Sequence, residues 1–77
     1  MGSLFSEFYD RALARLVEAR KKAKVTQMQL ADKLGRPQSF VSKYEMRERM
    51  LDVAEYITIA RILGADPYGM LQASEIE

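Results

Sequence analysis

Two short apolar-patterned segments, separated only by Gly35-Arg36-Pro37, constrain the fold of this chain more than any other feature. Before the break, Thr26 and Gln29 have the spacing of a capping box, which marks the start of a helix. Gly35 can end that helix because glycine adopts the left-handed backbone conformation without a steric cost, and Pro37 suits the first turn of the next helix. Helices this short are unstable alone, so the rest of the chain must brace them.

Further helices are predicted on both sides of this pair, because apolar residues recur there every three or four positions. The first begins near Ser3 or Ser6, either of which can cap free amide groups. A fourth begins at a second capping box, formed by Asp52 and Glu55, and a fifth begins at residues 66–67, where aspartate precedes proline. The sequence therefore predicts an all-α chain of five helices.

The whole chain, residues 1–77, is expected to form one domain, in which Gly64 ends the fourth helix and residues 72–77 form a flexible tail. The residues expected to face the core are Leu4, Phe5, Phe8, Ala12, Leu13, Leu16 and Val17 in the first helix, Met28, Leu30, Ala31 and Leu34 in the second, Phe40, Val41 and Tyr44 in the third, Val53, Ala54, Ile57, Ala60, Ile62 and Leu63 in the fourth, and Tyr68, Met70 and Leu71 in the fifth.

Composition excludes several classes of function. The chain has no cysteine and no histidine, which rules out disulfides, thiolate chemistry, imidazole catalysis and the usual zinc ligands. No apolar run approaches the roughly 18 residues that a membrane span needs. We therefore expect no enzymatic activity, no metal, no cofactor and no membrane segment.

The net charge of +1 hides a strong segregation of charge along the chain. Counted from the sequence, residues 1–19 carry −1, residues 20–49 carry +6 and residues 50–77 carry −4. A basic middle between acidic ends is typical of a surface that binds a polyanion. The alternative is a solvated run of charge with no partner.

The segment 26–46 resembles the helix-turn-helix of the Cro/repressor-type family, often called the Xre family. The resemblance extends from about Leu16 to Leu71. The elements that carry it are the Thr26-Gln27 opening, the Ala31…Gly35…Val41 spacing, the Tyr44-Glu45 ending and the Leu63-Gly64-Ala65-Asp66-Pro67 close. It implies binding of double-stranded DNA, with the third helix in the major groove.

The resemblance also assigns roles to particular side chains. The residues it places against base edges are Gln38, Ser39, Ser42 and Lys43, with glutamine suited to adenine. The residues it places against phosphates are Thr26, Gln27, Arg36, Arg47 and Arg49. Purely structural readings stay open: Thr26 caps a helix in either case, Gln38 and Ser39 can simply decorate a helix start, and Arg47 and Arg49 can form surface ion pairs with Glu48 or Glu45.

The sequence departs from the family pattern at Arg47, where a glycine commonly ends the third helix. Two outcomes are open. Either Arg47 adopts the left-handed conformation at a cost of about 1 kcal/mol, or the third and fourth helices fuse into one rod and invite a domain-swapped dimer. The capping box at Asp52 and Glu55 favours the break.

These features predict a sequence-specific transcriptional regulator, a repressor that acts as a homodimer on a palindromic operator in the cytoplasm of a bacterium. One alternative is an antitoxin that binds DNA and also a toxin partner, and another is a helical protein-interaction module that does not read DNA. The residues expected at the dimer interface are Tyr68, Met70, Leu71 and Ile76. Phe5 and Phe8 lengthen the first helix, so a neighbouring subunit is an alternative partner for them.

Overall fold

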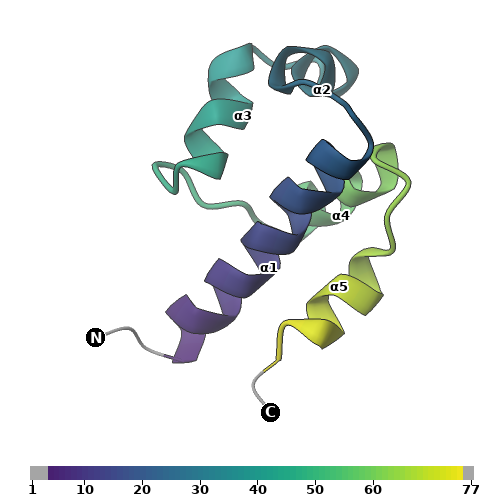
Figure 1. Cartoon of the computed structure of the whole chain (residues 1–77). Helices are drawn as coiled ribbons and strands as arrows, with labels where there is room; N and C mark the ends of the chain where they lie inside the picture. Colours follow the sequence, from purple (N-terminus) through teal and green to yellow (C-terminus); the bar gives the residue numbers. More distant parts are fainter. Residues whose placement is uncertain (1–3, 76–77) are drawn as a thin grey trace.

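The computed structural model describes residues 4–75, which form five helices and no strand. The helices are α1 (Leu4–Lys22), α2 (Gln27–Leu34), α3 (Gln38–Glu45), α4 (Val53–Ile62) and α5 (Pro67–Ala73). Figure 1 shows α2 and α3 together at one end, α1 running across α4, and α5 at the other end. None of these helices is both long and apolar enough to cross a membrane. The predicted all-α, five-helix fold is confirmed.

Local signals position α2 and the turn that follows it. The Gln29 amide donates to Thr26 Oγ1 at 3.0 Å, and the Thr26 amide donates to Gln29 Oε1 at 2.9 Å, so the predicted capping box is present. Gly35 ends the helix in the left-handed conformation, with φ 67°. Pro37 lies just before α3 in an extended conformation, so the prediction that it belongs to the first helical turn is wrong by one residue.

The chain breaks between α3 and α4. Arg47 has φ 64°, and the next amide, that of Glu48, donates to the Lys43 carbonyl at 2.9 Å. The second capping box then starts α4, with the Glu55 amide 2.7 Å from Asp52 Oδ1. The fused rod is therefore wrong, and the domain swap that it would have required loses its structural basis.

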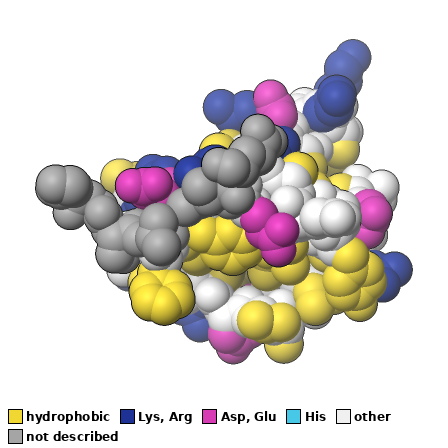
Figure 2. Space-filling model, turned by 90° about the horizontal axis from the view of Figure 1, so that it is seen from below, with side chains coloured by type: hydrophobic (Ala, Val, Ile, Leu, Met, Phe, Trp, Pro, Cys, Tyr) yellow, Lys and Arg dark blue, Asp and Glu magenta, His cyan; other side chains and the backbone are white. Residues whose placement is uncertain are grey.

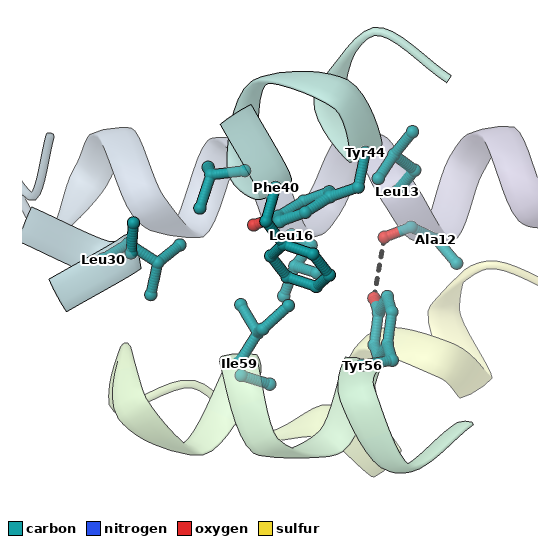
Figure 3. Close-up of a cluster of buried hydrophobic side chains, with 11 residues drawn as sticks. Ala12, Leu13, Leu16, Leu30, Phe40, Tyr44, Tyr56 and Ile59 are labelled. Carbon is teal, nitrogen blue, oxygen red and sulfur yellow. Dashed lines mark hydrogen bonds between the residues drawn. The ribbon is translucent and has the colours of Figure 1, made fainter. Parts of the chain in front are cut away.

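Hydrophobic side chains from α1, α2, α3 and α4 meet in one core (Figure 3). Its buried members are Ala12, Leu13, Leu16, Leu30, Ala31, Phe40, Val41, Tyr44, Tyr56, Ile59 and Ala60. The Phe40 and Tyr44 rings pack edge to face with centroids 5.7 Å apart. Tyr56 keeps its hydroxyl satisfied inside this core by donating to the Ala12 carbonyl at 2.7 Å.

Five predicted core positions, Phe5, Met28, Val53, Ala54 and Tyr68, are wrong, and each of them lies in the first turn of a helix. Phe5 is 86 % exposed and Val53 is 72 % exposed. The first buried side chains are Ala12 in α1 and Tyr56 in α4, so the neighbouring helices cover only the later turns. Apolar periodicity shows which face of a helix carries the apolar side chains. It does not show how many turns of that face a neighbouring helix covers. Figure 2 shows hydrophobic side chains spread over the end of the molecule away from α2 and α3.

The described part of the expected flexible tail is held in place. Residues 72–73 belong to α5, and Ser74 is fully buried, with its hydroxyl donating to the Met70 carbonyl at 2.7 Å. Two arginines of α1 cover the end of α5: Arg11 Nε lies 2.8 Å from the Ser74 carbonyl and Arg15 Nη2 lies 3.0 Å from the Ala73 carbonyl. Cations suit this negative end of the helix dipole. Residues 72–74 of the expected tail thus pack against the rest of the chain, and residues 76–77 lie outside the described part.

Candidate nucleic-acid interface

The four side chains predicted to read bases share the outer side of α3. Gln38, Ser39 and Lys43 are exposed and Ser42 is half-buried. The opposite side of the same helix consists of Phe40, Val41 and Tyr44, all buried. Helical periodicity therefore fixes the outer face, because the inner one is held in the core.

Three of these four side chains are unengaged within residues 4–75, where Gln38, Ser39 and Lys43 make no side-chain hydrogen bond or ion pair. Ser42 differs, since its hydroxyl donates to the Ser39 carbonyl one turn earlier at 3.3 Å. The outer face of α3 thus offers a glutamine amide, a serine hydroxyl and an ammonium group to an incoming partner.

The start of α2, where Gln27 contacts the end of α3, presents free backbone amides. Thr26 is occupied as the cap, and the first backbone bond of the helix is made by Leu30, whose amide donates to the Thr26 carbonyl. The amides of Gln27 and Met28 precede that bond and have no partner within the helix. Such a helix start favours anions, because free N–H groups and the positive end of the dipole coincide.

Gln27 itself belongs to an internal network that sequence reasoning missed. Its side-chain amide donates to Glu45 Oε1 at 2.9 Å. Arg20 donates to the same carboxylate from Nε at 2.7 Å and from Nη2 at 3.0 Å. Its Nη1 donates to the Val25 carbonyl at 2.9 Å. The network joins the end of α1, the start of α2 and the end of α3, so it fixes how α3 sits against α2. No sequence signal paired these residues, because Arg20 and Glu45 lie 25 positions apart.

Arg36 and Arg49 converge on Phe40 and Glu55. Their guanidinium carbons lie 4.6 Å and 4.8 Å from the centroid of the Phe40 ring. Arg49 binds the Glu55 carboxylate through both terminal nitrogens, at 2.9 and 2.8 Å, and Arg36 Nη2 lies 3.8 Å from the same group. The Arg49 hydrogen bonds, together with the Asp52 amide, lower the pKa of Glu55 to about 2. The sequence identified Glu55 only as a capping residue.

Arg47 turns away from α3 towards α1. Its Nε donates to Asp10 Oδ1 at 2.8 Å, and both side chains are about half exposed. The predicted surface ion pairs of Arg47 and Arg49 therefore exist, but their partners are Asp10 and Glu55. The prediction that Glu48 or Glu45 would be the partner is wrong.

The residues predicted at the dimer interface divide into three kinds. Tyr68 is 59 % exposed, with the Arg61 guanidinium 5.5 Å from its ring centroid. Met70 and Leu71 are half-buried and pack against the core of their own chain. Ile76 lies outside the described residues.

Comparisons with known proteins agree with this geometry. A helix-turn-helix family model matches residues 16–69, from the middle of α1 into α5. A solved structure described as an XRE-family like protein from Pseudomonas syringae pv. tomato str. DC3000 is 48 % identical in sequence, with a TM-score of 0.86. That similarity covers 91 % of this chain and 85 % of that chain. No curated protein matches the sequence.

Proposed function

The chain belongs to the Xre family of DNA-binding helix-turn-helix regulators, and from this we propose that it is a repressor that binds a two-fold symmetric operator as a homodimer. The observation that carries the proposal is the outer face of α3, where Gln38, Ser39 and Lys43 are exposed and have no partner within residues 4–75. A helix in the major groove reads base edges through such side chains.

In the proposed complex, α3 lies in the major groove and α2 crosses the backbone. Gln38 at the start of α3 pairs with a base, and adenine suits its amide because both present one donor and one acceptor. Lys43, one turn further along, contacts a guanine edge or a phosphate. The amides of Gln27 and Met28 receive a second phosphate, and Thr26 serves as the cap that aims them.

The homodimer is proposed because a single eight-residue α3 contacts few base pairs, and two copies double the sequence that is read. Two half-sites about 10 base pairs apart would place both copies on one side of the duplex. Binding of this kind involves no catalysis and takes place in the bacterial cytoplasm, where the DNA is.

The test is selection of bound duplexes from a random library at physiological salt, followed by binding of the selected site to Gln38→Ala. We expect a two-fold symmetric site, a loss of about 1–3 kcal/mol for the variant, and relaxed preference at one base pair of each half-site. Gln72→Ala is the matched control, because Gln72 is an exposed glutamine on α5, away from α3 (Figure 1). Binding without sequence preference would contradict the proposal.

A further inference from the structure

We infer that Glu55 is a positioning residue for DNA recognition, which holds Arg36 and Arg49 against α3 and so restricts the phosphates that these two cations can reach. The inference rests on the proposed DNA-binding function and adds a determinant of specificity on α4, outside the helix that reads bases.

The first observation is the geometry around the carboxylate. Arg49 makes two parallel hydrogen bonds to Glu55, at 2.9 and 2.8 Å, and Arg36 approaches the same carboxylate to 3.8 Å. Paired contacts of this kind fix the plane of a guanidinium group as well as its position. The Glu55 side chain is only 17 % exposed, whereas those of Arg36 and Arg49 are 48 % and 40 % exposed. The Glu55 carboxylate is thus largely covered, while the guanidinium groups of Arg36 and Arg49 face solvent.

The second observation is that the cations are also fixed to α3. Both guanidinium groups lie over the ring of Phe40, which is 8 % exposed and sits in the core. A cation over an aromatic face is held electrostatically by the ring. Arg36 comes from the α2–α3 turn and Arg49 from the α3–α4 loop, so one carboxylate and one ring hold cations from both ends of α3.

Fixed and free cations should act differently on DNA. Each guanidinium has five N–H donors, so Arg49 keeps donors for a phosphate while it stays bound to Glu55. A fixed cation meets a phosphate only when α3 is docked in its proper register. A released cation follows the backbone of any duplex and adds affinity that does not depend on sequence.

The deciding experiment is Glu55→Gln, with dissociation constants measured for the selected site and for a random duplex at several salt concentrations. Glutamine retains the capping box, since Gln29 plays that part at the start of α2. We expect tighter binding of the random duplex, a salt dependence steeper by about one unit of slope, and a ratio of specific to non-specific affinity lowered about tenfold.

Glu48→Gln is the matched control. It removes the same charge from the adjacent loop, and Glu48 is exposed and makes no ion pair within residues 4–75. The affinities of Glu48→Gln for the selected site and for the random duplex should change by the same factor, so that the ratio of specific to non-specific affinity stays as in the wild type. Arg49→Lys gives an independent test, because it keeps the charge but cannot form the paired contact. We expect this variant to lower the ratio of specific to non-specific affinity.

The inference would be overturned if Glu55→Gln kept the wild-type ratio of specific to non-specific affinity. It would also be overturned if Glu55→Gln and Glu48→Gln changed that ratio equally. If Glu55→Gln does not fold, as judged by its circular dichroism, an unchanged ratio in Arg49→Lys overturns it instead. Failure of the proposed function is visible separately, because the wild-type chain would then show no preference for any duplex.

Discussion

Arg47 adopts a backbone conformation that L-residues avoid. Its φ is 64°, and Lys24, with φ 60°, is the other non-glycine residue with positive φ between residues 4 and 75. The left-handed conformation costs roughly 1–2 kcal/mol for a residue with a Cβ atom. The exposed ion pair between Arg47 and Asp10 offsets at most about 1 kcal/mol of this cost. The break after α3 is therefore maintained by the packing around it rather than by the residue in it.

A comparison of Arg47→Gly with Arg47→Ala isolates this backbone cost, because both variants lack the guanidinium group. We expect the glycine variant to have the higher free energy of unfolding, by about 1 kcal/mol, since only alanine is strained at positive φ. Urea denaturation monitored by circular dichroism measures the difference. In a continuous helix the order would be reversed, because glycine is worse than alanine there by a similar amount. A more stable alanine variant would thus contradict the observed break.

Glu55 should make stability depend on pH in the acidic range. Its folded-state pKa is lowered from 4.5 to about 2, chiefly by the hydrogen bonds from Arg49, so folding favours the ionised carboxylate. The stabilisation is fully present above a pH of about 4.5 and is lost as the pH falls towards 2. We expect the difference in free energy of unfolding between wild type and Glu55→Gln to shrink over this interval. A difference that stays constant with pH would show that the Arg49 contact does not stabilise the ionised form.

At the scale of elements, four helices end in the same way. A left-handed residue follows each of α1, α2, α3 and α4, and the next amide donates to the carbonyl five positions back. The donor and acceptor pairs are Val25 to Arg20 at 3.2 Å, Arg36 to Ala31 at 3.0 Å, Glu48 to Lys43 at 2.9 Å and Ala65 to Ala60 at 2.9 Å. This is the hydrogen bond of the Schellman motif.

The sequence predicted only half of the left-handed residues at these helix ends. Gly35 and Gly64 were predicted because glycine marks the left-handed position, and both have positive φ. Lys24 was missed and Arg47 was left open, because neither residue type signals that conformation. Helix starts were predicted better, since the capping boxes of α2 and α4 are local pairs three residues apart.

The contact between Arg20 and Glu45 sets the relative position of three elements, and its removal should be costly. The two side chains are 11 % and 8 % exposed. Glu45→Ala leaves Arg20 nearly buried without its carboxylate, so we expect the free energy of unfolding to fall by about 3 kcal/mol. The double variant Arg20→Met, Glu45→Leu should recover at least half of that loss, because no uncompensated charge remains. Thermal and urea denaturation measure both effects, and equal losses in the single and double variants would contradict this account.

For the whole molecule, the all-α class and the outer face of α3 could be predicted because periodicity and caps are local. The ion-pair partners of the charged residues could not be predicted from the sequence. Arg47 pairs with Asp10 across 37 positions and Arg20 with Glu45 across 25, and only the packing of α1 against the helix-turn-helix brings them together. Three of the predicted phosphate-binding side chains also make contacts within the fold: Gln27 donates to Glu45, Arg47 to Asp10 and Arg49 to Glu55.

The proposed homodimer needs an apolar surface, and the structure offers a better one than α5. Phe5 and Met50, 86 % and 66 % exposed, line one groove together with Tyr9, where α1 begins and the α3–α4 loop passes, and Ser6 and the Asp10–Arg47 ion pair complete its lining. Met70 and Leu71 of α5 are already packed against their own core. Burial of one aromatic side chain removes about 150–250 Å² from water, so we propose that two copies meet at the Phe5 groove.

Phe5→Ser should therefore shift the equilibrium from dimer to monomer, and Tyr68→Ser should not. Light scattering coupled to size exclusion, over a range of protein concentrations, measures the dimer dissociation constant of each variant. Loss of the Phe5 ring should raise this constant at least about tenfold, since full burial of such a side chain contributes about 1.5–3 kcal/mol. Because Phe5 makes no contribution to the core, the monomeric variant should keep the unfolding midpoint of the wild-type monomer. A monomer produced by Tyr68→Ser alone would instead place the interface on α5, where the sequence had suggested it.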